Sequence, residues 1–306
     1  MLGAAALTVL LAVVVLTALV ALTEHAAQTG ARQRLAAAPD ATVRVSGRYD
    51  PAGLRAADPP VRAALDGVFG PVEHQVQPLL RAPAADTRQL PAAGDTMWLT
   101  LLGVADPASH ARLTEGRWPR TAAGPGAKTV EAAFDRDYAA RFGLRPGSRV
   151  AAGRLTLQVS GLYTRRAAQG PLWNGMTGTF GLPDSIVLLA PGSFAAAPPL
   201  AADAAALWIA TPDSRRLTLD QIGPLRERIP AFAASRTDLS VFGGAPPPLR
   251  EVAVKTQLSY ELGQLDVPVA VARAGMYLPA ALLAALAAAP GASTSTTPRS
   301  GGSCSS

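Results

Sequence analysis

The chain has few of the residues and motifs on which disulfide-bonded, metal-binding and nucleotide-binding proteins depend. Its single cysteine, Cys304, can form no intrachain disulfide. The three histidines are far apart in the sequence, and no H-E-x-x-H or paired-cysteine spacing accompanies them: His25, His74 and His110. We therefore expect no metal site.

Sequence motifs for catalysis are also missing. No G-x-x-x-x-G-K-[ST] loop is present, so the chain has no visible means of holding nucleotide phosphates, and any ATP hydrolysis has to come from a partner. No G-x-S-x-G elbow occurs, so a hydrolase has no motif in its favour. We expect no catalytic residues, no cofactor and no enzymatic activity.

Charged residues make up only 16% of the 306 residues, and the net charge is +6. Only Lys128 and Lys255 among the 28 basic residues are lysine, which indicates a GC-rich coding sequence more than a selected surface. The arginines are scattered singly, apart from two adjacent pairs, and form no basic stripe. Nucleic-acid binding is therefore not expected.

Hydrophobic residues are abundant, at 49%, so the chain can bury a substantial core in one or two domains outside any membrane segment. Residues 2–23 carry no charge, and as a helix they would extend roughly 33 Å against a hydrocarbon core of about 30 Å. A cleaved signal peptide is the alternative. It should have a basic start and a shorter apolar core, so the pattern favours a membrane anchor.

The alanine-rich run after this segment predicts that the helix continues as a stalk to residue 38, where Pro39 ends it. The charges beside the span do not decide its orientation, because only the initiator methionine precedes it. Long domains cross a membrane largely regardless of charge, so the following segment is compatible with a place outside the cytoplasm.

The long middle of the chain interleaves strand and helix patterns irregularly, which predicts an α+β domain. The predicted strands are 42–50, 97–104, 154–163, 185–191 and 206–213, and the predicted helices are 59–70 and 217–229. A second apolar region follows over 249–289. Its first part has the helical spacing of Leu249, Val252 and Leu258, and its last part, 274–289, would extend roughly 24 Å, a few residues short of a full span.

Residues 113–150, "LTEGRWPRTAAGPGAKTVEAAFDRDYAARFGLRPGSRV", predict a compact series of turns around one strand and one short helix. Pro119 restricts Trp118 to an extended conformation, and residues 128–134 are strand-like. Asp135 is placed to cap a helix through residue 140 that ends at Gly143. Residues 145–148, "RPGS", have the Pro-Gly centre of a type II turn.

This stretch, together with the N-terminal helix and stalk, resembles the extracytoplasmic core domain of FtsX-like, MacB-type ABC transporter permeases. The matching positions are Gly116, Arg117, Trp118, Pro119, Gly143, Leu144, Pro146 and Gly147. Ser148 departs from the family, which often has an acidic residue there. The resemblance implies a plasma-membrane protein with an extracytoplasmic domain, a cytoplasmic ABC ATPase as partner and a second permease copy or homologue.

The resemblance implies a permease subunit that couples the ATPase to the outer domain for export or mechanotransmission. Such permeases continue past their second span, whereas residues 290–306 are polar and predict a disordered tail, so we expect an N-terminal fragment. The alternative is a self-contained, membrane-anchored binding or scaffolding module. The predicted organisation is a transmembrane helix 1–23, a stalk helix 24–38, a core domain 39–248, a descending stalk helix 249–267, a second, incomplete transmembrane helix 268–289 and the tail.

Overall fold

A computed structural model describes residues 2–38, 41–48, 51–83, 99–166, 171–174, 186–235, 250–265, 270 and 274. The chain divides into two compact units. One is Gly30–Asp266, and the other combines Met1–Thr29 with Val267–Ser306. The single helix α1, Leu2–Ala37, begins in the second unit and ends in the first.

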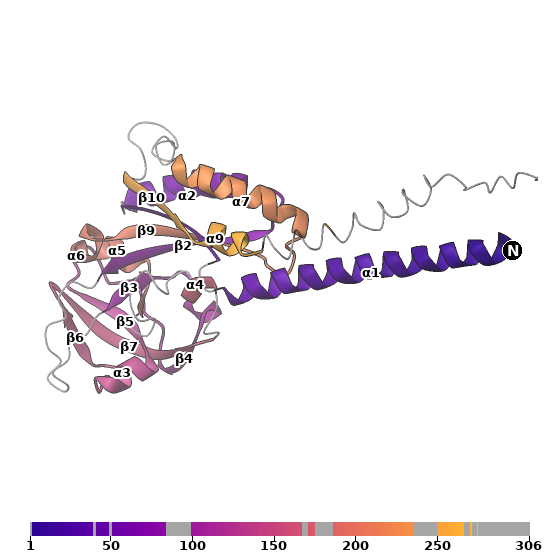
Figure 1. Cartoon of the computed structure of the whole chain (residues 1–306). Helices are drawn as coiled ribbons and strands as arrows, with labels where there is room; N and C mark the ends of the chain where they lie inside the picture. Colours follow the sequence, from indigo (N-terminus) through magenta and orange to yellow (C-terminus); the bar gives the residue numbers. More distant parts are fainter. Residues whose placement is uncertain are drawn as a thin grey trace, which may run out of the picture. The chain divides into compact units, whose positions relative to one another are not determined.

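Helix α1 is long and apolar, as the sequence predicts (Figure 1). Its segment Val13–Ala37 has the length and composition to cross a membrane, which a signal sequence would also have. Several large apolar side chains along it are exposed, among them Leu11 at 64% and Leu22 at 67%. Apart from positions 270 and 274, the predicted second span over 268–289 lies outside the described residues.

The unit Gly30–Asp266 is built on a mixed sheet of ten strands among the residues that the structure describes. Their order is β10-β1-β9-β2-β3-β8-β5-β7-β4, and β6 pairs with β7. The strands are β1 Val43–Arg48, β2 His74–Pro83, β3 Thr100–Gly103, β4 Ala111–Gly116, β5 Thr129–Asp135, β6 Arg149–Ala152, β7 Leu155–Arg165, β8 Ile186–Leu189, β9 Ala205–Pro212 and β10 Arg250–Thr256.

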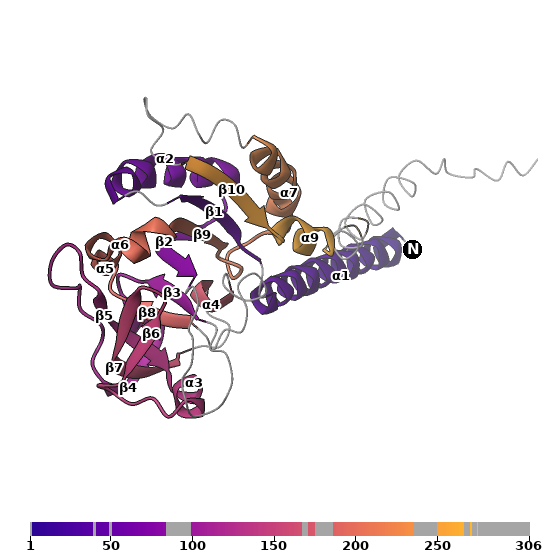
Figure 2. The same cartoon turned by 90° about the vertical axis from the view of Figure 1, so that its left-hand side faces the viewer.

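Among the described residues of this unit, all helices but two are short. They are α2 Pro51–Phe69, the 3-10 turn η1 Pro107–Ser109, α3 Arg136–Arg141, α4 Pro171–Asn174, α5 Gly192–Ala196, α6 Pro198–Ala202, α7 Leu219–Ala234 and α9 Leu258–Gly263. The longer helices, α2 and α7, pack against each other over one face of β1, β9 and β10 (Figures 1 and 2).

One half of the sheet has the topology of two interleaved β-α-β units. Helix α2 connects β1 to β2, and α7 connects β9 to β10. The four strands lie in the order β10-β1-β9-β2, and every neighbouring pair is antiparallel. This is the ferredoxin-like arrangement, in which each crossover skips one strand. Residues 84–204 form an insertion between β2 and β9.

The inserted half continues the same sheet with parallel pairs. Strand β2 extends past β9 to pair with β3, and β3 lies parallel to β8. Strand β7 pairs with β5 in parallel and with both β4 and β6 antiparallel. A core cluster joins the two halves, because Leu79, Leu207 and Ile209 of the first half pack with Tyr163 and Trp173 of the second.

The predicted mixture of strands and helices is confirmed, and each strand predicted in the middle of the chain coincides with a strand of the sheet. The descending stalk helix over 249–267 is wrong in its first half, because Arg250–Thr256 is strand β10. Val252, Val254 and Thr256 are β-branched at alternating positions, which suits a strand better than a helix. Pairing with β1 also gives hydrogen-bond partners to the backbone groups along the facing edges of β1 and β10.

A hydrogen bond from a buried tryptophan fixes α2 to the sheet. The indole N–H of Trp208, a fully buried residue of β9, donates to a carboxylate oxygen of Asp58 in α2 at 2.8 Å. The other oxygen of Asp58 pairs with Arg62 at 2.9 Å. This carboxylate therefore orients the helix over the strand as well as neutralising a charge.

Replacing Asp58 by alanine should lower the free energy of unfolding by about 1–3 kcal/mol, because the buried indole N–H would lose its acceptor. Urea unfolding of the chain, followed by tryptophan fluorescence, measures this loss. Asp58→Asn is the matched control, since the amide oxygen can still accept from Trp208, and its loss should be smaller. Equal losses for the two variants would show that the charge, and not the hydrogen bond, is what matters.

Candidate functional site

The turn Gly116–Pro119 leaves β4 in close contact with β7. Gly116 has φ +72°, and a Cβ atom there would lie 2.3 Å from the carbonyl oxygen of Ser160. The next backbone N–H, of Arg117, donates to that same oxygen at 2.9 Å. Only glycine combines the left-handed conformation with this close approach. Trp118 then packs against the core, with its ring 6.5 Å from that of Tyr163.

Both ends of helix α3 have the form that the sequence predicts. The Asp135 side chain accepts from the backbone N–H groups of the first turn, and Gly143 follows the helix at φ +63°. Gly143 N–H donates to the carbonyl of Ala140 at 3.2 Å, and Leu144 N–H donates to that of Ala139 at 2.9 Å. These two bonds form a Schellman motif, which satisfies the last carbonyls of the helix.

The turn Arg145–Ser148 also has its predicted form. Gly147 has φ +95°, and Ser148 N–H donates to the carbonyl of Arg145 at 2.9 Å. Both features are those of a type II turn. The Ser148 hydroxyl accepts from Arg145 N–H at 3.0 Å, so it supplies a side-chain acceptor within this turn.

The structure brings these two turns to neighbouring residues of β7. Gly147 N–H donates to the carbonyl of Val159 at 2.7 Å, and Arg117 N–H donates to that of Ser160. Ser160 lies where the register between β5 and β7 shifts by one residue, as in a β-bulge. The matching positions therefore shape one strand of the sheet. Whether they mark the resembled family stays a prediction.

An ion pair holds the first turn to β5. The Arg117 guanidinium donates to both carboxylate oxygens of Glu131, which also accepts from Arg120 N–H at 2.9 Å. The hydrogen bonds from Arg117 lower the pKa of Glu131 below its ordinary value, against the opposing effect of partial burial. The same bonds raise the pKa of Arg117. The sequence pattern indicates Arg117 but not Glu131, which is the one charged residue in "TVEAAF".

The end of α1 is fixed into the unit Gly30–Asp266. Ala31 and Leu35 are buried there at 4% and 3% exposure. Arg32 donates through Nε to the carbonyl of Leu217, just before α7, at 3.0 Å. Arg34 contacts the side chain of Gln264, just after α9, at 3.4 Å. The last turns of α1 thus have polar contacts to the segments that flank two other helices.

A cavity of about 400 Å³ opens beside this attachment, and we call it the α1 cavity. Its walls come from the last residues of α1, the residues just before β1, Gln75 of β2, and the end of β9 with the turn after it. Its lining combines apolar side chains with polar ones and with one residue of each charge, Asp213 and Arg215. The residues are Leu35, Ala36, Ala38, Ala41, Thr42, Gln75, Thr211, Pro212, Asp213, Ser214 and Arg215.

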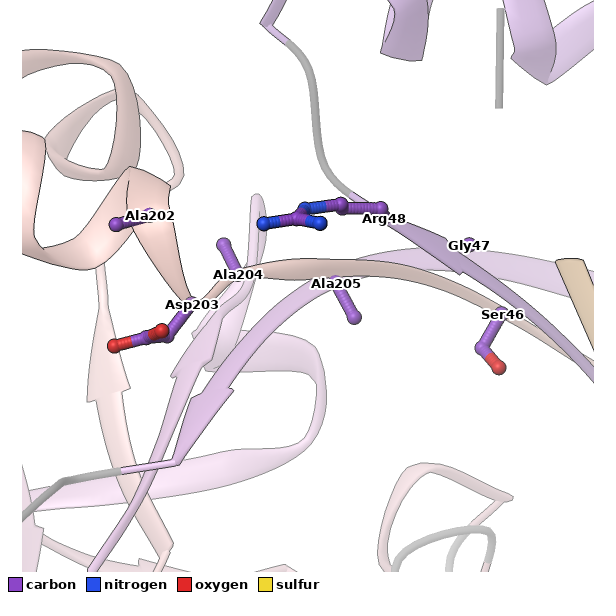
Figure 3. Close-up of a pocket in the computed structure, with 7 residues that line it drawn as sticks. All are labelled: Ser46, Gly47, Arg48, Ala202, Asp203, Ala204 and Ala205. Carbon is purple, nitrogen blue, oxygen red and sulfur yellow. The ribbon is translucent and has the colours of Figure 1, made fainter. Parts of the chain in front are cut away.

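A second hollow of about 440 Å³ lies between the end of β1 and the turn before β9 (Figure 3). It is lined by Ser46–Arg48 and by Ala202–Ala205. Figure 3 shows the Arg48 side chain extending from β1 above Ala204, with the Asp203 carboxylate on the other side of that residue. Arg48 and Asp203 are the charged residues of an otherwise small and neutral lining.

The histidines stay apart among the described residues. His74 pairs with Asp66 at 3.0 Å and stacks on Phe69, whereas His110 contacts the amide of Gln77. Burial lowers the pKa of His110 below its ordinary value, and the charge of Asp106 opposes this. No cluster of three or more potential metal ligands occurs within the part of the chain that the structure describes.

Comparison with known proteins gives distant structural similarity only. No protein-family model matches the chain, and no curated protein sequence matches it. The periplasmic region of MacB from Actinobacillus actinomycetemcomitans aligns at 8% identity and a TM-score of 0.33, over 76% of this chain and 94% of that one. A domain of a "putative Permease protein" from Porphyromonas gingivalis aligns at 10% and 0.33, over 72% and 96%. Similarity this low does not establish a family.

Replacing Gly116 by alanine should destabilise the chain more than the same change at Gly143. Both residues are left-handed, which costs alanine about 1–2 kcal/mol, but nothing lies within 4 Å of a Cβ at Gly143. At Gly116 the new methyl group must also displace the carbonyl of Ser160. Urea unfolding of the two variants compares the losses, and similar values would contradict a steric role for Gly116.

Replacing Glu131 by glutamine should reduce stability at pH 7 and have little effect in acid. The pKa of Glu131 is lowered in the folded state, so its contribution is present above the unfolded pKa of about 4.3 and is lost as the pH falls through the lowered folded value. Unfolding midpoints measured at pH 7 and in steps below pH 4 should therefore converge for wild type and variant. Glu115→Gln is the control, and a pH-independent difference at position 131 would refute the ionic contribution.

Proposed function

We propose that the chain is part of a permease subunit of an ABC transporter, anchored in the plasma membrane with its α/β unit on the outer side. The observation that carries the proposal is that α1 combines an exposed apolar segment with a C-terminal end buried in the unit Gly30–Asp266. One continuous helix therefore links a segment suited to lipid with a folded domain. The sequence resemblance to FtsX-like, MacB-type permeases gives this link its proposed role.

In this proposal α1 transmits movement between the membrane and the domain. Leu35 is buried in the unit, and Arg32 donates to the backbone carbonyl of Leu217, just before α7. Displacement of α1 along its axis would therefore also displace the segment that leads into α7. Helix α7 packs on both α2 and α9, which gives the displacement a route into the sheet. Energy would come from a cytoplasmic ABC ATPase, and the subunit would work with a second permease copy or homologue.

The proposed division of the chain matches the predicted one with a single change. Residues 1–23 form the span, 24–38 the stalk and 39–248 the core domain. Residues 249–267 contain β10 and α9 in place of a long helix, so the return to the membrane starts after α9. Residues 268–289 remain the proposed second transmembrane segment.

The outer location can be tested in intact cells. With Cys304 replaced by serine and cysteine introduced at the exposed position Ala108, a membrane-impermeant maleimide should label the chain without lysis, since Ala108 belongs to the proposed extracytoplasmic unit. Labelling of a cytoplasmic marker should need lysis. If Ala108→Cys is labelled only after lysis, the outer location and the permease proposal both fail.

The permease and the self-contained module predict different coding sequences downstream of the second apolar region. Under the permease proposal, the DNA beyond codon 290 is expected to encode, in one of its three reading frames, an apolar run, a basic cytoplasmic loop and further spans. Resequencing the gene through that codon checks this directly. If no frame continues in this way, a membrane-anchored binding or scaffolding module explains the same outer domain better.

A further inference from the structure

The positive charge of the chain is concentrated in one part of the sheet. Residues 99–166, which contain β3 to β7, include 11 basic and 5 acidic residues, which gives a net charge of +6. The whole chain has 28 basic and 22 acidic residues, so the remaining 17 of each sign cancel. Arginines that are scattered along the sequence are therefore brought together by the fold of the inserted half.

Three strands of this region present a polar face to solvent. Thr129 and Glu131 of β5 lie opposite Thr156 and Gln158 of β7. Arg149 of β6 lies opposite the same Gln158, on its other side. Cross-strand partners share a face of the sheet, so these five side chains lie on the same one. Each is exposed or half-buried, whereas the alternate residues of β7 are buried on the opposite face.

Three guanidinium groups border this face, and one of them is neutralised. Arg117 is paired with Glu131, whose carboxylate also accepts from the backbone N–H of Arg120 at 2.9 Å. Arg120 therefore lies at the β5 side of the row, and Arg149 lies two strands away, at about 10 Å. Both arginines are exposed, and neither guanidinium makes an ion pair or a hydrogen bond with a described residue.

The groups between these arginines are neutral and both donate and accept hydrogen bonds. Thr129, Thr156 and Gln158 have hydroxyl and carboxamide side chains, and these make no hydrogen bond with the part of the chain that the structure describes. Their polar groups are therefore left to solvent or to a ligand. We call this surface the basic face: Arg120, Thr129, Arg149, Thr156 and Gln158, beside the Glu131 ion pair.

The basic face lies far from the α1 cavity. Strand β7 is six strands from β1 in the sheet, and at about 4.8 Å per strand this is about 29 Å. The end of α1, by contrast, lies beside the residues that lead into β1. A partner of the basic face is therefore expected to come from solution and not from the lipid proposed around α1.

We propose that the basic face binds an extended acidic polysaccharide. Its sulfate, phosphate or carboxylate groups would accept from Arg120 and Arg149, because a guanidinium binds two oxygens of such a group at once. The hydroxyls between these acidic groups would exchange hydrogen bonds with Thr156 and Gln158, which offer donors and acceptors in the same place. An acidic polypeptide has no such hydroxyls, so the neutral centre favours the sugar polymer. This inference goes beyond the permease proposal and does not depend on it.

Biolayer interferometry on the full-length chain in zwitterionic lipid nanodiscs tests the proposal. Immobilised heparin is the probe. The comparisons are uncharged dextran, poly-L-glutamate, single-stranded DNA, and vesicles of equal parts phosphatidylcholine and phosphatidylglycerol. We expect saturable binding of heparin that weakens as the salt concentration rises, no binding of dextran, and weaker binding of the other three. No binding of heparin, or equal or tighter binding of another anionic probe, would overturn the proposal.

Matched pairs of substitutions separate the basic face from the total charge. Arg120→Gln combined with Arg149→Gln should weaken heparin binding about tenfold, because both charge contacts are lost. Arg55→Gln combined with Arg215→Gln removes two exposed charges outside the inserted half and should change the affinity by less than twofold. Equal losses for the two double variants would show that only the total charge matters, which would overturn the proposal.

A substitution at the centre of the face provides a second test that keeps the arginines. Gln158→Glu places a carboxylate opposite Arg149, where it repels acidic groups and competes for the guanidinium, so heparin binding should weaken about tenfold. Gln75→Glu makes the same change at an exposed position of β2 and should have less than a twofold effect. Equal effects would again contradict the proposal. None of these outcomes bears on the labelling of Ala108→Cys that tests the permease proposal.

Discussion

The sheet depends on the backbone hydrogen bonds of β9. This strand lies between β1 and β2, and both of its edges are paired along most of its length. Backbone groups buried without partners are rarely tolerated, so β1 and β2 cannot stay in place unless β9 returns between them. The whole insertion, residues 84–204, has to fold so that its ends allow this return. The positions of α2, α7 and the α1 attachment all depend on it.

The opposite faces of this four-strand region differ in what covers them. Helices α2 and α7 cover one face, where Val43, Val45 and Trp208 are fully buried. Near the end of α1 the other face is polar, with Thr42, Thr211 and Gln75 in one row. A core that served stability alone would place apolar side chains there. The retained hydroxyls are therefore a local cost to stability.

Local sequence patterns were sufficient where the structure is determined by neighbouring residues. The Asp135 cap, the Gly143 helix end and the Pro-Gly turn all involve contacts within a few residues, and each was predicted. Strand β10 was not, because its apolar residues also have helical spacing, and the pairing with the edge of β1 decides between the two. Strand β2 was missed because its polar glutamines interrupt the apolar pattern of a buried strand. They face the side of the sheet away from α2 and α7, which only the strand pairing shows. The partnership of Arg117 with Glu131 and the row of hydroxyls require the strand order, which no single segment contains.

The pairing of β1 with β10 also has a consequence for synthesis of the chain. Thr42 and Thr256, which are hydrogen-bonded at 2.8 Å, are 214 residues apart. During translation, the edge of β1 that β10 will occupy therefore emerges long before its partner. Contacts of such high sequence separation slow folding, and an open strand edge invites association with other chains. A ribosome that stops shortly before residue 250 would release a chain with nearly all of its strands and one edge of β1 still exposed, which makes such a chain prone to associate through that edge.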